Sequence, residues 1–219
     1  MAKHKLVFWS VDVQVDFILP GGALYVPGAE KLVPNIQRLV SAALASGTSI
    51  VSSGDAHRPN DPEFAKFPPH CIAGTPGARI LPEALGERVC IIANDASAKL
   101  LNNICDCPQI LFEKQTLDVF DNPHAGQLVD LLGPDAEYLV FGAVTEFCVR
   151  CAAKGLLERG RKVFVVTDAI AALTPEESRR TLDELQSLGA RAVTTQAALE
   201  MLRATPPQSA VSSAEHSSR

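Results

Sequence analysis

The chain lacks the sequence features that mark membrane, secreted and nucleic-acid-binding proteins. Its net charge of −5 comes without a block of basic residues, so neither a nucleic acid nor an anionic membrane surface is expected as a partner. No apolar run reaches the length of a membrane span. No secretory signal is recognised, because the first residues lead directly into a short strand-like segment. We therefore expect a cytoplasmic protein.

Cysteine is too sparse for a disulfide scaffold. The six cysteines in 219 residues are interpreted as reduced thiols, since no secretory signal accompanies them. Cys105-Asp106-Cys107 and Cys148-Val149-Arg150-Cys151 suggest a metal or redox site. However, a structural zinc site uses paired C-x-x-C units, and only one such spacing is present. A thioredoxin-like pair would also lack the proline-containing turn between its thiols.

The composition is that of one globular domain. Hydrophobic residues make up 47% of the chain and charged residues 21%, which favours a folded over a disordered protein. The length fits a single domain with a substantial core, which we place at residues 1–203. Residues 204–219 are rich in Pro, Ser and Ala, and we expect this tail to be disordered.

Short apolar segments alternate with segments of helical periodicity. The expected strands are residues 6–12, 48–53, 89–93, 110–112, 138–141, 162–167 and 190–194. The expected helices are residues 29–46, 125–132, 146–159, 175–188 and 195–203, while residues 98–104 are ambiguous. Nearly continuous apolar strands between amphipathic helices indicate an α/β fold with a parallel sheet covered on both faces.

Ligands of such folds bind beyond the carboxyl ends of the strands. The reactive residues are therefore expected at those ends. Five candidates lie there: Asp12, Asp55, Lys114, Cys148 and Asp168.

Cys148 follows the strand at 138–141 and lies near the first turn of the next helix. Free N–H groups and the helix dipole favour a thiolate at such a position, which suits a nucleophile. The alternative is that Cys148 is a small buried apolar residue, as most cysteines are.

Asp12 and Lys114 each have two interpretations. A carboxylate at the end of an apolar strand is partly desolvated, which would raise the pKa of Asp12 and suit it to proton transfer. Alternatively, Asp12 caps the following turn, a role that fits Asp16 better. Lys114 could end in solvent, or it could face the sheet edge and hold Asp12 and Cys148 in ionised forms.

The loop after the second strand carries two carboxylates and two imidazoles within sixteen residues. Asp55 and His57 lie on one side of an extended segment, because side chains alternate with a period of two. Glu63 and His70 complete a mixed oxygen and nitrogen set that suits zinc, iron or manganese. We therefore favour one divalent transition metal over a solvated loop.

Four motifs together resemble the cysteine-hydrolase superfamily that includes nicotinamidases and isochorismatase-like proteins. The motifs are residues 11–17, the loop from Asp55 to Gly77, Lys114, and residues 142–149. The resemblance spans residues 5–200 and includes the order of the elements. It implies a three-layer α/β/α fold with a mostly parallel, six-stranded, Rossmann-like sheet.

The resemblance also implies roles for single residues. Asp12, Lys114 and Cys148 match the catalytic triad, and the metal loop maps to Asp55, His57 and His70, with Glu63 where some nicotinamidases use a fourth ligand. A cis peptide is implied between Val144 and Thr145, next to an oxyanion hole formed by the N–H groups of Thr145 and Cys148. Phe17 and Phe67 are candidates for the walls around the substrate.

The expected activity is metal-assisted hydrolysis of a small amide through a thioester, with nicotinamide as the leading substrate. Other small amides, ureides or N-carbamoyl compounds stay open, because residues 115–123 depart from the run that we associate with nicotinamidases. Two further alternatives are a metal-hydroxide hydrolase with a structural Cys148 and a silent, isochorismatase-like binding protein. Self-association into a homo-oligomer is expected from the family.

Overall fold

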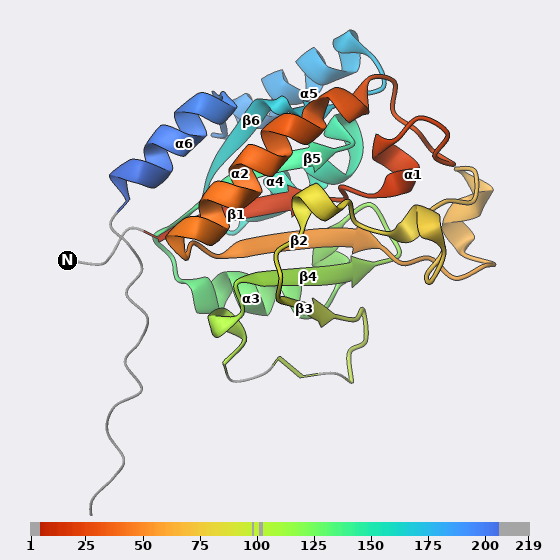
Figure 1. The fold of residues 1–219 in the computed structure, drawn as a ribbon, viewed down its shortest axis with the longest axis horizontal. Helices are drawn as coiled ribbons and strands as arrows, with labels where there is room; N and C mark the ends of the chain where they lie inside the picture. Colours follow the sequence, from red (N-terminus) through yellow and green to blue (C-terminus); the bar gives the residue numbers. More distant parts are fainter. Residues whose placement is uncertain (1–4, 98, 101–102, 206–219) are drawn as a thin grey trace, which may run out of the picture.

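The structure is a computed structural model and describes residues 5–97, 99–100 and 103–205. Its centre is a parallel sheet with the strand order β3-β4-β2-β1-β5-β6-β7 (Figure 1). The strands are β1 (Lys5–Val11), β2 (Ile50–Asp55), β3 (Val89–Ile92), β4 (Gln109–Lys114), β5 (Ala136–Ala143), β6 (Lys162–Ala171) and β7 (Arg191–Val193). The expected α/β fold is confirmed, but the expected count of six strands is wrong. Both short edge strands, β3 and β7, pair with their neighbours and bring the sheet to seven.

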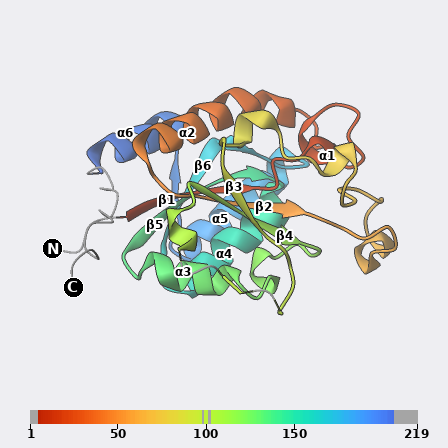
Figure 2. The same ribbon diagram turned by 60° about the horizontal axis from the view of Figure 1, so that its bottom comes forward.

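Helices cover both faces of this sheet, as the sequence predicts. Helices α2 (Val33–Ser46) and α6 (Thr195–Ala204) lie on one face, and α3 (Ala125–Leu132), α4 (Arg150–Glu158) and α5 (Pro175–Ser187) lie on the other (Figure 2). Alternation along β1 supplies both cores. Leu6 and Phe8 pack in the cluster under α2 and α6, whereas Val7, Trp9 and Val11 pack in the cluster that contains α3, α4 and α5 residues.

The helix ends follow local signals. Gly47 ends α2 with φ 70°, a left-handed conformation that glycine adopts without strain. Thr174 caps α5, and its hydroxyl accepts a hydrogen bond from Glu177 N–H. The segment predicted as one helix at 29–46 is divided into a 3-10 turn, Ala29–Leu32, and α2. The short helix α1 (Val15–Ile18) follows β1 at the carboxyl edge.

The expectation of reduced cysteines is wrong for one pair, since Cys90 and Cys107 form a disulfide. Cys90 lies on β3 opposite Ile110, and Cys107 lies two residues before the start of β4, the strand that pairs with β3. Cys71, Cys105, Cys148 and Cys151 are free.

Two expectations fall partly outside the described residues. Of the ambiguous segment 98–104, residues 98, 101 and 102 are not described, and Ile104 begins a 3-10 turn. Of the tail, Ala204 ends α6 and Thr205 is described, whereas residues 206–219 lie outside the described part. No helix in the described part of the chain is long and apolar enough to cross a membrane.

Candidate active site

Four of the five predicted strand-end residues meet at the carboxyl edge of the sheet. Asp12 directly follows β1, Asp55 ends β2 and Lys114 ends β4, where Asp55 and Lys114 are in register. Cys148 lies in a π-helical turn, Thr145–Val149, between β5 and α4.

Asp168 does not belong to this group. Strand β6 continues to Ala171, so Asp168 lies within the strand and not at its end. Its carboxylate accepts hydrogen bonds from the N–H and the hydroxyl of Thr195, at 2.6 and 2.9 Å. Asp168 therefore stabilises the start of α6, and the prediction that it is a site residue is wrong.

Lys114 is the buried cation at the centre of the site. Its Nζ lies 2.8 Å from Asp12 Oδ2 and also forms an ion pair with Asp55 Oδ1. It donates to the Thr116 carbonyl at 3.0 Å and to the Cys148 sulfur at 3.5 Å. The two carboxylates raise the pKa of Lys114 well above its usual range despite its complete burial. The lysine is therefore a fixed positive charge beside the thiol, and it does not extend into solvent.

Asp12 is fully buried and has the left-handed backbone angle φ 46°. This turn directs its carboxylate back over the sheet edge, where Ser53 Oγ donates to Oδ1 at 2.6 Å. Burial raises the pKa of Asp12, and Lys114 partly opposes this shift. An ionised carboxylate with a raised pKa is suited to accept a proton. The alternative role of turn capping belongs to Asp16, which accepts from Ala23 N–H at 3.0 Å.

The Cys148 thiol lies close enough to Asp12 for a proton transfer from sulfur to the carboxylate. The sulfur and one carboxylate oxygen each of Asp12 and Asp55 all lie within 4.8 Å of one another. Burial raises the pKa of the Cys148 thiol, Lys114 lowers it, and the two carboxylates raise it further. Burial therefore opposes the thiolate that the helix start alone predicts.

The backbone before Cys148 approaches β1 closely. Gly142 has φ 123°, and a Cβ there would lie 2.0 Å from the Val11 carbonyl oxygen, so only glycine fits. A cis peptide is present, but it joins Ala143 to Val144 and not Val144 to Thr145. Because neither residue is a proline, the sequence indicated the segment that contains the cis peptide but not which of its bonds is cis. Thr145 is buried, and its role and that of Cys148 in an oxyanion hole stay a prediction.

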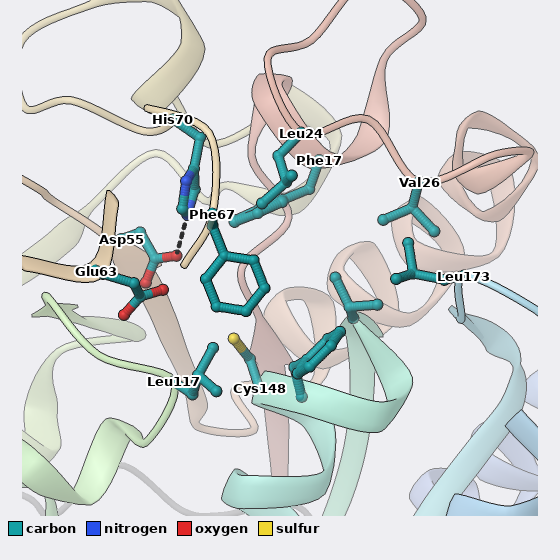
Figure 3. A pocket seen from close by; sticks show the side chains of 12 residues that line it. Phe17, Leu24, Val26, Asp55, Glu63, Phe67, His70, Leu117, Cys148 and Leu173 are labelled. Carbon is teal, nitrogen blue, oxygen red and sulfur yellow. Dashed lines mark ion pairs between the residues drawn. The ribbon is translucent and has the colours of Figure 1, made fainter. Parts of the chain in front are cut away.

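A donor set for a metal lies next to the triad. Asp55 Oδ2 lies 3.6 Å from Nε2 of His57 and 3.6 Å from Nε2 of His70, an ion pair drawn in Figure 3 for His70. One ligand atom from each of the three residues lies within 4.8 Å of the others, and all three residues are buried. Nε2 of His57 has no hydrogen-bond partner. An orphaned buried nitrogen facing a carboxylate oxygen fits a divalent transition metal.

The second ring nitrogen, Nδ1, of each histidine faces a protein oxygen. Nδ1 of His70 donates to the Pro68 carbonyl at 2.8 Å, and Nδ1 of His57 lies 3.2 Å from Asp61 Oδ2. The His70 hydrogen bond keeps the proton on Nδ1 and leaves Nε2 free to bind a metal, whereas Nδ1 of His57 makes no hydrogen bond with the described residues. Asp61 was not predicted as a site residue.

Glu63 lies at the pocket but outside this three-residue donor set. It lines the cavity together with Asp55 and His70 (Figure 3). Partial burial and the charge of Asp55 raise the pKa of Glu63. Its role as a fourth ligand stays a prediction.

The cavity lined by Cys148 is small, with a volume of about 60 Å³. Phe17 and Phe67 line it, as expected for walls of the site (Figure 3). Val144, predicted next to the oxyanion hole, also lines the cavity. Sequence reasoning missed the other apolar lining residues, because isolated apolar residues carry no pattern: Leu24, Val26, Leu117, Phe147 and Leu173.

Comparisons with known proteins agree with this arrangement. The model of the isochorismatase domain family matches residues 6–197. Nicotinamidase from Escherichia coli is 26% identical over 206 residues, covering 82% of this chain and 90% of that protein. Nicotinamidase/pyrazinamidase from Mycobacterium tuberculosis is 29% identical over 184 residues, covering 81% and 92%. The structure of Pyrococcus horikoshii pyrazinamidase in complex with zinc has 27% identity and a TM-score of 0.67, covering 87% and 99%.

A parallel α/β sheet with a thiol, a carboxylate and an ammonium group at its carboxyl edge defines a hydrolase of the isochorismatase-like type. The chain belongs to the isochorismatase family and acts on a non-peptide C–N bond of an amide.

Proposed function

We propose that the protein is a metal-assisted cysteine amidohydrolase that releases ammonia from a small uncharged amide, with nicotinamide converted to nicotinate as the leading reaction. The observation that supports this best is the buried contact of Lys114 with both Asp12 and the Cys148 sulfur. Cys148 lines the cavity, and the buried proton acceptor Asp12 and the buried cation Lys114 lie next to its sulfur.

The first half-reaction forms a thioester. Asp12 accepts the proton of the Cys148 thiol, and the sulfur attacks the amide carbonyl carbon. The N–H groups of Thr145 and Cys148 are proposed to stabilise the oxyanion that develops. Asp12 then returns the proton to the nitrogen as the C–N bond breaks, so the leaving group departs as ammonia.

The second half-reaction restores the thiol. A water molecule attacks the thioester carbonyl carbon and gives its proton to Asp12. The carbon–sulfur bond breaks, and the acid leaves. Cys148 recovers a proton from Asp12, so the cycle consumes one water and releases one ammonia. Lys114 stabilises the negative charge that resides on sulfur or on Asp12 at each stage.

A divalent ion, zinc, iron or manganese, would be held by Asp55, His57 and His70, with Glu63 as a further candidate. When bound, it would supply a Lewis-acidic contact that orients the substrate, such as one to a pyridine nitrogen. The proton transfers and the attack are carried out by the side chains of the chain itself.

The lining of the cavity supports an uncharged substrate. None of the described residues that line it is Lys or Arg, and most are apolar. The nearest buried cation, Lys114, is already paired with Asp12 and Asp55. A substrate carboxylate would therefore find no Lys or Arg side chain to pair with among these residues, and its desolvation is costly. Phe17 and Phe67 offer instead flat apolar surfaces to an aromatic amide.

An ammonia-release assay with matched substrates tests the proposal. Nicotinamide and pyrazinamide are the neutral substrates, and maleamate and an N-carbamoyl amino acid are the anionic ones, with metal analysis on the same sample. We expect turnover of nicotinamide and little turnover of the anionic amides. Ammonia release only from the anionic amides would contradict the substrate assignment, and release from none of them would contradict the amidohydrolase assignment. A cytoplasmic location and a homo-oligomeric state stay predictions.

A further inference from the structure

The sheet has an unfilled position next to Asp55. Strands β1 and β2 pair up to Val11 and Ser53, and the Asp12 N–H donates to the Ser53 carbonyl at 3.1 Å. The chain then turns away at Asp12, which has φ 46°. Asp55 keeps its neighbour Lys114 on the β4 side, but β1 no longer offers it a backbone partner. An unsatisfied buried peptide group at this position would be costly.

The side chain of Gln14 takes the place of the missing strand. Its Oε1 accepts from the Asp55 N–H at 2.7 Å, and its Nε2 donates to the Asp55 carbonyl at 2.8 Å. Nε2 also donates to the Ala78 carbonyl at 2.8 Å. Gln14 is only 1% exposed. The amide therefore acts as a peptide unit would, and it ties Asp55 to the loop that carries Ala78.

Asp55 is the residue that joins the two parts of the site. One of its carboxylate oxygens pairs with Lys114, and the other faces Nε2 of His57 and of His70. A small rotation of the Asp55 backbone would move both oxygens at once. Whatever fixes that backbone therefore fixes the donor set and the charge beside the thiol together.

We propose that Gln14 is a positioning residue that holds the Asp55 carboxylate in the geometry needed to bind a divalent metal. The proposal rests on the metal-assisted function given above, but Gln14 contacts neither the reacting atoms nor the ion. Glutamine is required because one terminal group must both accept from an N–H and donate to two carbonyls. Glutamate cannot donate when ionised, and methionine can do neither.

The same chain provides a matched control in Gln109. Gln109 is also fully buried, and it also makes three hydrogen bonds: it accepts from Gly86 N–H at 2.6 Å and donates to Ser52 Oγ and to the Ala84 carbonyl at 2.8 Å each. It begins β4, at the opposite end of the strand from Lys114. If Gln14 had a purely structural role, Gln14→Met and Gln109→Met would change Tm and zinc affinity in the same way.

The experiment compares these two variants by zinc affinity and by thermal unfolding, with zinc as the probe. Both variants are expected to lower Tm, because each loses three buried hydrogen bonds. Only Gln14→Met should weaken zinc binding, by about 10- to 100-fold, as for other residues that orient metal ligands. If Gln14→Met does not fold, Gln14→Glu takes its place, because it has the same length and keeps an acceptor for the Asp55 N–H.

The outcomes separate this proposal from the proposed function. Zinc affinities of the Gln14 and Gln109 variants that agree within about twofold would overturn the positioning role. This margin is well below the change in zinc affinity expected for a residue that orients a metal ligand. Failure of the wild-type chain to bind zinc at the Asp55 site would overturn it as well. Absence of amide turnover in a wild-type protein that binds zinc would count only against the proposed function.

Discussion

Lys114 Nζ lies 2.8 Å from Asp12 Oδ2, and both side chains are buried. The ammonium also pairs with Asp55, so one cation compensates two carboxylates in a water-poor environment. Buried charges persist only when they are paired and hydrogen-bonded. The catalytic proposal and the stability of the sheet edge thus depend on the same three residues.

Replacement of Lys114 should therefore destabilise the fold as well as abolish turnover. Lys114→Met leaves Asp12 and Asp55 buried without a cation, and breaking such a group costs about 3–5 kcal/mol. Urea unfolding followed by circular dichroism measures the change. Lys154→Met is the control, because Lys154 pairs with Glu158 at 3.7 Å on the exposed surface and such pairs contribute at most about 1 kcal/mol. Similar losses in both variants would show that Lys114 is not the buried centre described above.

The pH profile of kcat/KM should report the ionisation of Asp12. Asp12 must be ionised to accept the thiol proton, so the rate should fall as pH drops through its pKa. Burial raises the pKa of Asp12, which places the acid limb above the ordinary carboxyl value of about 4. Zinc content measured at each pH separates this limb from loss of metal. An acid limb at or below the ordinary value would argue against Asp12 as the base.

Phe67→Ala should raise KM for nicotinamide by about tenfold while kcat changes little, because an aromatic wall binds the ground state and the transition state alike. Phe67 lines the cavity together with Cys148. Leu131→Ala is the control, since Leu131 is 60% exposed and does not line the cavity. Steady-state kinetics on the two variants decides the question, and an unchanged KM in Phe67→Ala would remove Phe67 from the substrate site.

The disulfide between Cys90 and Cys107 should make stability sensitive to reductant. It closes a loop with a sequence separation of 17 residues, for which a stabilisation of about 2–4 kcal/mol is typical. Reduction should lower the free energy of unfolding of the wild type and of Cys105→Ser, but not that of Cys90→Ser. If Cys90→Ser responds to reductant as the wild type does, these cysteines are not joined in solution.

Much of the fold could be predicted from local patterns. Apolar segments such as residues 138–141, between amphipathic helices, are sufficient to indicate a parallel sheet, because only strands buried on both faces have that composition. The edge strands were harder to count as part of the sheet, since β3 and β7 are short and partly exposed. The Cys90–Cys107 pair could not be predicted, because it depends on the register of β3 against β4.

The candidate site could be predicted where chemistry follows directly from position. The strand ends indicated three site residues: Asp12, Asp55 and Lys114. The same rule gave a wrong prediction for Asp168, because its strand continues to Ala171. Gln14 could not be found in this way. It acts on the backbone of a residue 41 positions away, and nothing in the local sequence shows that a strand partner is missing there.

The most direct test is rapid-quench mass spectrometry of the protein mixed with nicotinamide, in the wild type and in Cys148→Ala. The expected result is a transient mass increase of one nicotinoyl group, located on the peptide that contains Cys148. Cys148→Ala should form no adduct and release no ammonia, while its metal content is unchanged. Undiminished turnover in Cys148→Ala, or an acyl group on another residue, would contradict the cysteine mechanism.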